Sequence, residues 1–162
     1  MPSVLFVCTA NRYRSPLAAA FFQKLLLDNA DRSWVVDSAG TWTQAGLPPE
    51  PEAVQLARLY GADIEKYRSK LIDEELLAKF DLIIGMEMGH KEALQVEFPS
   101  LRERIHSFSE AVDGRAYDIP DPFDNQGHLD NNVGIDIYKL ISTKYENIMQ
   151  LTKRVAGKVT NR

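Results

Sequence analysis

The sequence predicts an α/β fold in three layers, with a four-stranded parallel sheet covered by helices on both faces. Short apolar segments alternate with helical patterns along the chain, which is typical of parallel βαβ units. The first apolar segment runs directly into a helix start. Of the 162 residues, 44% are hydrophobic and 26% are charged, as in an ordinary globular protein. We therefore expect one domain that spans residues 1–162.

Four segments have the composition of strands buried in a parallel sheet, because they are short, apolar and rich in β-branched and aromatic residues. They cover residues 3–7, 34–39, 80–86 and 105–108. Ligands of such sheets bind beyond the carboxyl ends of the strands. We therefore expect Cys8, Ser38 and Met86 to meet at that edge.

Five segments have helical patterns. They cover residues 16 to about 29, 51 to about 60, 72–77, 90–97 and 133 to about 156. Pro16 and Pro51 fit the first turn of a helix, where a missing N–H costs nothing. Gly61 is expected to end the second helix, and Asp73 to cap the start of the third. The last helix is expected to turn a set of large residues toward the core: Ile135, Ile137, Tyr138, Ile141 and Ile148.

Cys8, the only cysteine, stands where the first strand ends and the first helix begins. A lone cysteine is usually a small buried hydrophobe. Here, however, Arg14 and a helix N-terminus follow, and both favour a thiolate and an anionic ligand. The segment 8–15, called the phosphate loop below, therefore predicts a nucleophile beside a phosphate site. Backbone N–H groups would surround the phosphate oxygens, with these residues contributing: Thr9, Ala10, Asn11, Arg12, Tyr13 and Ser15.

The chemistry also requires an acid, and Asp121 is the best candidate. Pro120 and Pro122 on either side of it restrict the backbone and hold the carboxyl group on a stiff loop within residues 117–132. The same three residues alone are equally typical of a rigid surface turn. Together with a cysteine and an arginine at a phosphate site, they favour a general acid for phosphate-ester cleavage.

The composition excludes several other classes of function. A net charge of -4 gives no reason to expect binding to nucleic acid or to a membrane. One cysteine cannot form an internal disulfide, which indicates a reducing compartment, and we expect a cytoplasmic protein. The three histidines, His90, His106 and His128, lack metal-ligand spacing and are interpreted as surface or cap residues, so no metal site is expected.

Five motifs resemble those of the low-molecular-weight protein tyrosine phosphatase family, in the same order and spacing along nearly the whole chain. They lie at residues 8–16, 38–42, 68–70, 80–86 and 118–123. The resemblance implies a four-stranded parallel sheet and a two-step reaction through a phosphocysteine, without metal or cofactor. Phosphotyrosine-containing protein would be the substrate, and phosphate or oxyanions such as vanadate would bind in the loop.

The resemblance also implies the role of each matching residue. Cys8 would be the nucleophile, Arg14 the phosphate clamp, and Asp121 the acid that protonates the tyrosyl oxygen and then activates water. Asn11, in a left-handed conformation, would stabilise the loop with Ser38 as its partner. The aromatic walls of the substrate pocket would be Trp42 and Phe123, and Arg12 would also line it.

The chain departs from the family pattern at four positions. Ala10 replaces a glycine, and Tyr13 replaces a second loop cysteine that can protect the nucleophile by forming a disulfide. Tyr67 stands where relatives often carry a histidine that supports the loop asparagine. Arg12 stands where a small or aliphatic residue is usual; a cation pointing inward there would disfavour phosphoarginine.

Different functions could use the same scaffold. A protein-arginine phosphatase uses nearly the same chemistry. An arsenate reductase would need further cysteines to relay electrons. A phosphocarrier would need a long-lived phosphocysteine, which Asp121 would hydrolyse. A phosphoprotein-binding module without catalysis would not require all of these residue types.

Overall fold

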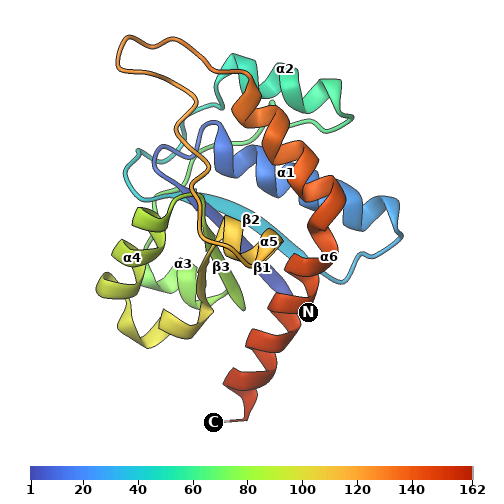
Figure 1. Cartoon of the computed structure of the whole chain (residues 1–162), viewed down its shortest axis with the longest axis vertical. Coiled ribbons are helices and arrows are strands. Elements are labelled where there is room, and N and C mark those ends of the chain that lie inside the picture. The colour runs from blue at the N-terminus through green and yellow to red at the C-terminus, as the bar shows by residue number, and fades with distance from the viewer. Residues whose placement is uncertain (162) are drawn as a thin grey trace.

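Four parallel strands form the centre of the molecule, in the order β2-β1-β3-β4 (Figure 1). The computed structural model describes residues 1–161, so residue 162 of the expected domain lies outside it. The strands are β1 (Ser3–Cys8), β2 (Val35–Gly40), β3 (Leu82–Gly85) and β4 (Ile105–Ser107). The predicted four-stranded parallel sheet is confirmed, although Trp34 and Phe80 lie just outside their strands.

Helices cover both faces of this sheet. The helices are α1 (Arg14–Asp28), α2 (Pro51–Leu59), α3 (Glu74–Ala78), α4 (Met88–Glu97), α5 (Phe108–Asp113) and α6 (Asn132–Thr160), and a 3-10 helix, η1, covers Pro99–Arg104. In Figure 1, α1 and α6 lie on one side of the sheet and α3 and α4 on the other. The predicted three layers are therefore confirmed.

The alternation of side chains along β1 explains why both layers form. Val4, Phe6 and Cys8 belong to the core beneath α1, α5 and α6. Leu5 and Val7 belong to the second core, beneath α3 and α4. A strand buried on both faces must be apolar throughout, as β1 is. Cys8, its last residue, is thereby fixed at the carboxyl edge of the sheet.

A close approach of two backbones fixes this edge. Gly40, at the end of β2, pairs with Cys8. A Cβ atom at Gly40 would lie 2.6 Å from the Thr9 carbonyl oxygen and 3.0 Å from the Asn11 Cβ. Only glycine therefore allows β2 to pass this closely beside the loop that follows β1.

Several boundaries differ from the sequence-based prediction, and α5 was not predicted. Phe108 begins α5 rather than ending the fourth strand, because Ser107 and Glu110 form a capping box. Asp73 caps α3 as predicted, accepting a hydrogen bond from the Leu76 N–H at 2.7 Å. In α6, Ile137 is buried as expected, whereas Ile135 is only partly buried and lies outside the core. Within residues 1–161, no helix has the length and apolar character that crossing a membrane requires.

Candidate active site

The Cys8 sulfur lies at the bottom of the phosphate loop. Its side chain is buried, and the Asn11 N–H donates to Sγ at 3.3 Å. Ser15 Oγ lies 2.9 Å from Sγ. Asn11 Nδ2 donates to Ser15 Oγ at 2.8 Å, and the Ser15 hydroxyl also lies 3.4 Å from the Ala39 carbonyl oxygen, to which it can donate. A thiolate on Cys8 has no proton of its own, so toward a thiolate the Ser15 hydroxyl is the donor. Two donors therefore converge on Sγ, an arrangement that stabilises a thiolate.

Asn11 organises the loop from within. Its φ angle of 58° is in the left-handed region, where asparagine is tolerated better than most residues. The side chain is fully buried and uses its whole hydrogen-bonding capacity. Nδ2 donates to Ser15 and Ser38, and Oδ1 accepts from Tyr67 Oη and from the Lys70 N–H. The loop therefore contacts both β2 and the segment before α3.

Tyr67 closes a ring of hydrogen bonds around Asn11. Asn11 Nδ2 donates to Ser38 Oγ at 3.0 Å, Ser38 Oγ donates to Tyr67 Oη at 2.7 Å, and Tyr67 Oη donates to Asn11 Oδ1 at 2.7 Å. Burial raises the pKa of Tyr67, so this hydroxyl keeps its proton at neutral pH. Tyr67, which stands where relatives often carry a histidine, therefore supports Asn11 directly.

Arg14 is buried at the start of α1 and held by two partners. Its Nη1 lies 3.0 Å from a carboxylate oxygen of Glu87 and donates to the Ile119 carbonyl oxygen at 2.8 Å. Both contacts use the same nitrogen. The guanidinium is therefore fixed in orientation by α4 on one side and by the segment before Asp121 on the other. Neither Glu87 nor Ile119 was singled out from the sequence.

His90 connects α4 to the phosphate loop. Its Nδ1 accepts from the Glu87 N–H at 3.1 Å, so the ring proton of the neutral form is on Nε2, which donates to Thr9 Oγ1 at 2.9 Å. Burial, and then the charge of Arg14, lower the pKa of His90. The expectation that His90 is a cap residue is confirmed, because it completes the capping box of α4. In residues 1–161, no three potential metal-ligating side chains of His, Cys, Asp or Glu lie together.

One cavity of about 300 Å³ brings the three predicted catalytic residues together. Cys8, Arg14 and Asp121 line it. It is also lined by other residues predicted for the site: Thr9, Ala10, Arg12, Tyr13 and Phe123. Asn11 and Ser15 also belong to the phosphate loop, but they are fully buried and do not line the cavity. A larger cavity, of about 400 Å³, is lined by Ser38 and Tyr67 but not by Cys8, Arg14 or Asp121.

Asp121 lies on an exposed loop whose base is fixed. Its Oδ1 accepts from the Phe123 N–H at 3.0 Å. Before it, the Asp118 carboxylate accepts from the Met88 N–H at 2.7 Å, and the Ile119 N–H donates to the Met86 carbonyl oxygen at 2.9 Å. Residues 117–124, called the acid loop below, therefore start from two contacts with the β3–α4 junction.

The side chains predicted for the substrate pocket differ in position. Arg12 lines the cavity, where Nε donates to the Pro48 carbonyl oxygen at 2.8 Å and Nη1 pairs with Glu50 at 2.9 Å. Phe123 also lines it. Trp42 does not, and its side chain is 84% exposed. The Trp42 backbone N–H donates to the Thr9 carbonyl oxygen at 3.0 Å, so the residue follows the phosphate loop, and its role as a wall of the substrate pocket stays a prediction.

We expect protonation of His90 to destabilise the fold in acid. Because the pKa of His90 is below its usual 6.5 in the folded protein, the unfolded chain takes up this proton first as the pH falls. The free energy of unfolding then decreases from about pH 6.5 downward. In urea denaturation, the wild-type protein should lose more stability between about pH 7 and pH 5 than a His90→Gln variant. The same loss in both proteins would contradict this.

The comparisons with known proteins agree with this geometry. The family model described as low molecular weight phosphotyrosine protein phosphatase matches residues 3–160. A protein-arginine-phosphatase of Bacillus subtilis (strain 168) is 31% identical over 154 residues, which are 94% of this chain and 95% of that protein.

Two solved structures have the same fold. The low molecular weight protein tyrosine phosphatase from T. tengcongensis superimposes with a TM-score of 0.80 and 31% identity, covering 90% of this chain and 99% of that one. Vibrio vulnificus Wzb in complex with benzylphosphonate superimposes with a TM-score of 0.74 and 29% identity, covering 94% and 98%. With Cys8 and Arg14 in one loop facing Asp121, and a family model that matches almost from end to end, the chain belongs to the low molecular weight phosphotyrosine protein phosphatase family.

Proposed function

We propose that the enzyme hydrolyses phosphotyrosine in proteins through a phosphocysteine formed on Cys8. One observation carries the proposal: Cys8, Arg14 and Asp121 line the same cavity, while the Asn11 N–H donates to the Cys8 sulfur and Ser15 Oγ lies 2.9 Å from it. A nucleophile, a cation and a carboxyl group around one cavity are what the cleavage of a phosphate monoester requires. This placement supports the role proposed below for each residue.

In the first step, the phosphoryl group sits in the phosphate loop, where backbone N–H groups and Arg14 neutralise its oxygens. The Cys8 thiolate attacks phosphorus, so an S–P bond forms as the P–O bond to the tyrosyl oxygen breaks. Asp121, protonated at this stage, donates its proton to that oxygen, and the tyrosine side chain leaves as a neutral phenol.

In the second step, Asp121 is a carboxylate and acts as a base toward water. Water attacks phosphorus, its proton passes to Asp121, and the S–P bond breaks. The electron pair returns to Cys8, where the Ser15 hydroxyl and the Asn11 N–H stabilise the thiolate. Inorganic phosphate leaves, and the enzyme regains its starting protonation state.

The cavity wall favours an aryl phosphate. Phe123 offers a ring face or edge to a flat substrate, and Arg12 places a cation in the same wall. A phosphoarginine side chain carries a positive guanidinium, which Arg12 would repel. A second candidate function, that of a protein-arginine phosphatase, is favoured by the name of the Bacillus subtilis relative and by Glu50, which pairs with Arg12 and offsets its charge.

Arsenate reduction and phosphoryl transfer to a carrier fit this site less well than hydrolysis. The sequence has one cysteine, so the electron relay that an arsenate reductase needs has no second thiol. A phosphocarrier must keep its phosphocysteine until transfer, and Asp121 in the same cavity favours hydrolysis instead.

The mechanism is tested by the hydrolysis of p-nitrophenyl phosphate. We expect Cys8→Ser to abolish turnover, Asp121→Asn to lower kcat by about 100-fold or more, and vanadate to inhibit the wild-type enzyme competitively. Asp136→Asn is the control, because Asp136 is exposed on α6 and does not line the cavity. Turnover by Cys8→Ser would contradict the mechanism.

The substrate class is tested with phosphotyrosine and phosphoarginine peptides of the same sequence. We expect kcat/KM to be at least about tenfold higher for phosphotyrosine, because a repulsion of about 1.4 kcal/mol corresponds to that factor. Arg12→Gln should move the ratio toward phosphoarginine. A preference for phosphoarginine in the wild-type enzyme would instead establish a protein-arginine phosphatase.

Oxidation should inactivate the enzyme in a way that depends on external thiols. Cys8 has no second cysteine with which to form an internal disulfide, so peroxide converts its thiolate to a sulfenic acid that continues to higher oxides. We expect activity to return only when a thiol reductant is added early, before the sulfinic acid forms. Recovery without any added thiol, measured after removal of peroxide, would contradict this.

A further inference from the structure

Tyr13 occupies a position between three parts of the active site. It precedes α1 in the phosphate loop, its side chain is 4% exposed, and it lines the cavity that contains Cys8 and Asp121. Its ring belongs to the core beneath α1 and α6. Because this large side chain belongs to the loop that holds the nucleophile, its contacts fix neighbouring segments relative to that loop.

The ring of Tyr13 contacts the acid loop. It packs edge-to-face against Phe123, with ring centroids 5.9 Å apart and an angle of 84° between the planes. Phe123 follows Asp121 by two residues, and its N–H bonds the Asp121 carboxylate. The contact between the two rings therefore fixes the part of the acid loop to which the carboxylate is tied.

The hydroxyl group of Tyr13 reaches the start of α6. A Cβ atom at Gly134 would lie 2.5 Å from Tyr13 Oη and 2.2 Å from Leu56 Cδ2, so glycine leaves the space that the hydroxyl occupies. The phenol therefore packs into a notch in α6 that only glycine provides.

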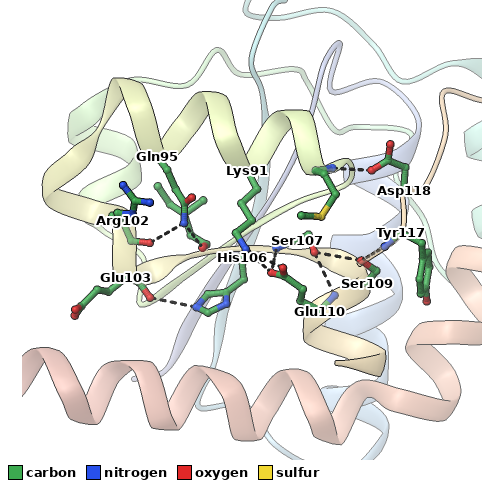
Figure 2. A network of polar contacts seen from close by, with 12 residues as sticks. Lys91, Gln95, Arg102, Glu103, His106, Ser107, Ser109, Glu110, Tyr117 and Asp118 are labelled. Carbon is green, nitrogen blue, oxygen red and sulfur yellow. Dashed lines mark hydrogen bonds and ion pairs between the residues drawn. The ribbon is translucent and has the colours of Figure 1, made fainter. Parts of the chain in front are cut away.

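The acid loop is consequently held at two ends. At its base, Ser109 Oγ accepts from the Tyr117 N–H at 3.0 Å, and Asp118 bonds the start of α4 (Figure 2). Arg14 contacts the base as well, through the Ile119 carbonyl oxygen. Beyond Asp121, the Asp130 N–H donates to the Pro122 carbonyl oxygen at 2.7 Å.

The base is itself braced by a polar network between α4 and α5. Figure 2 shows Lys91 reaching Glu110, whose carboxylate is 2.8 Å from the Lys91 Nζ. Ser107 and Ser109 lie side by side in the same network, 3.2 Å apart through their hydroxyl oxygens. The contacts that hold the base of the acid loop therefore do not involve Tyr13. The segment beyond Asp121, in contrast, contacts the phosphate loop through the packing of Phe123 on Tyr13.

We propose that Tyr13 is a positioning residue that holds Asp121 over Cys8, by packing on Phe123 and seating its hydroxyl against Gly134 of α6. This inference rests on the proposed function, because it assigns Tyr13 a role through the acid. Through Asp121, Tyr13 would affect the protonation of the leaving oxygen and not the attack by the sulfur.

The leaving group distinguishes this role from a purely structural one. Phenyl phosphate releases a phenol about as basic as tyrosine and needs the acid, whereas p-nitrophenyl phosphate releases a far weaker base and needs it less. We expect Tyr13→Leu to lower kcat/KM for phenyl phosphate about tenfold more than for p-nitrophenyl phosphate. In Tyr13→Phe, which keeps the ring contact, most of this difference should disappear.

Two further measurements complete the test. In an Asp121→Asn background, Tyr13→Leu should lower kcat/KM for phenyl phosphate by less than about twofold, because the residue through which it acts is absent. The control is Tyr60→Leu: Tyr60 packs edge-to-face on Phe21 and stacks on Tyr138 away from the cavity, so its loss should reduce stability and leave the leaving-group ratio unchanged.

The outcomes separate the inference from the proposed function. Equal losses for both substrates in Tyr13→Leu, or fully additive effects with Asp121→Asn, would overturn the role of Tyr13. An Asp121→Asn variant with the wild-type leaving-group ratio would overturn the role of Asp121 itself. If Tyr13→Leu does not fold, Phe123→Leu takes its place, because it removes the same ring contact from the side of the acid loop, and a wild-type leaving-group ratio in Phe123→Leu would overturn the inference.

Discussion

The conformation of Asn11 is the constraint on which the site depends. A left-handed backbone at this residue bends the phosphate loop, and four hydrogen bonds to its side chain keep it there. The side chain is fully buried, so any of these groups left without a partner would cost about 1–3 kcal/mol. Because Asn11 also donates to Ser15 and its own N–H reaches Cys8, the same constraint sets the hydrogen bonds on the sulfur.

The charged groups around the phosphate loop hold the Arg14 guanidinium in a fixed orientation at the cavity. Arg14 is paired with Glu87 through a single nitrogen, which orients the guanidinium. His90, which contacts Thr9, has a lowered pKa because it is buried and faces Arg14. A neutral His90 adds no further positive charge behind the loop, so the cations at the cavity are Arg14 and, in its wall, Arg12.

The sequence predicted the elements that depend on local patterns. The strand that ends at Cys8 follows from an apolar run, and the start of α3 from Asp73 as its cap. Contacts across long separations were predictable only where the family resemblance named the partner, as for Asn11 and Ser38. Tyr67 lies 56 residues from Asn11, and a tyrosine hydroxyl in place of a histidine gives no local signal of its partner. The 84% exposure of Trp42 was likewise not predictable from its aromatic character alone.

The central claim, that the hydrogen bonds of Asn11 preform the oxyanion site, is tested most directly by vanadate inhibition of an Asn11→Gly variant. Glycine accepts the left-handed φ without strain, so this change keeps the backbone conformation available and removes the buried side chain with its four hydrogen bonds. We expect vanadate to inhibit the variant at least about tenfold more weakly than the wild type, a difference of about 1.4 kcal/mol. Asn29→Ala, on the exposed end of α1, should be inhibited like the wild type. Equal inhibition of Asn11→Gly and the wild type would contradict the claim.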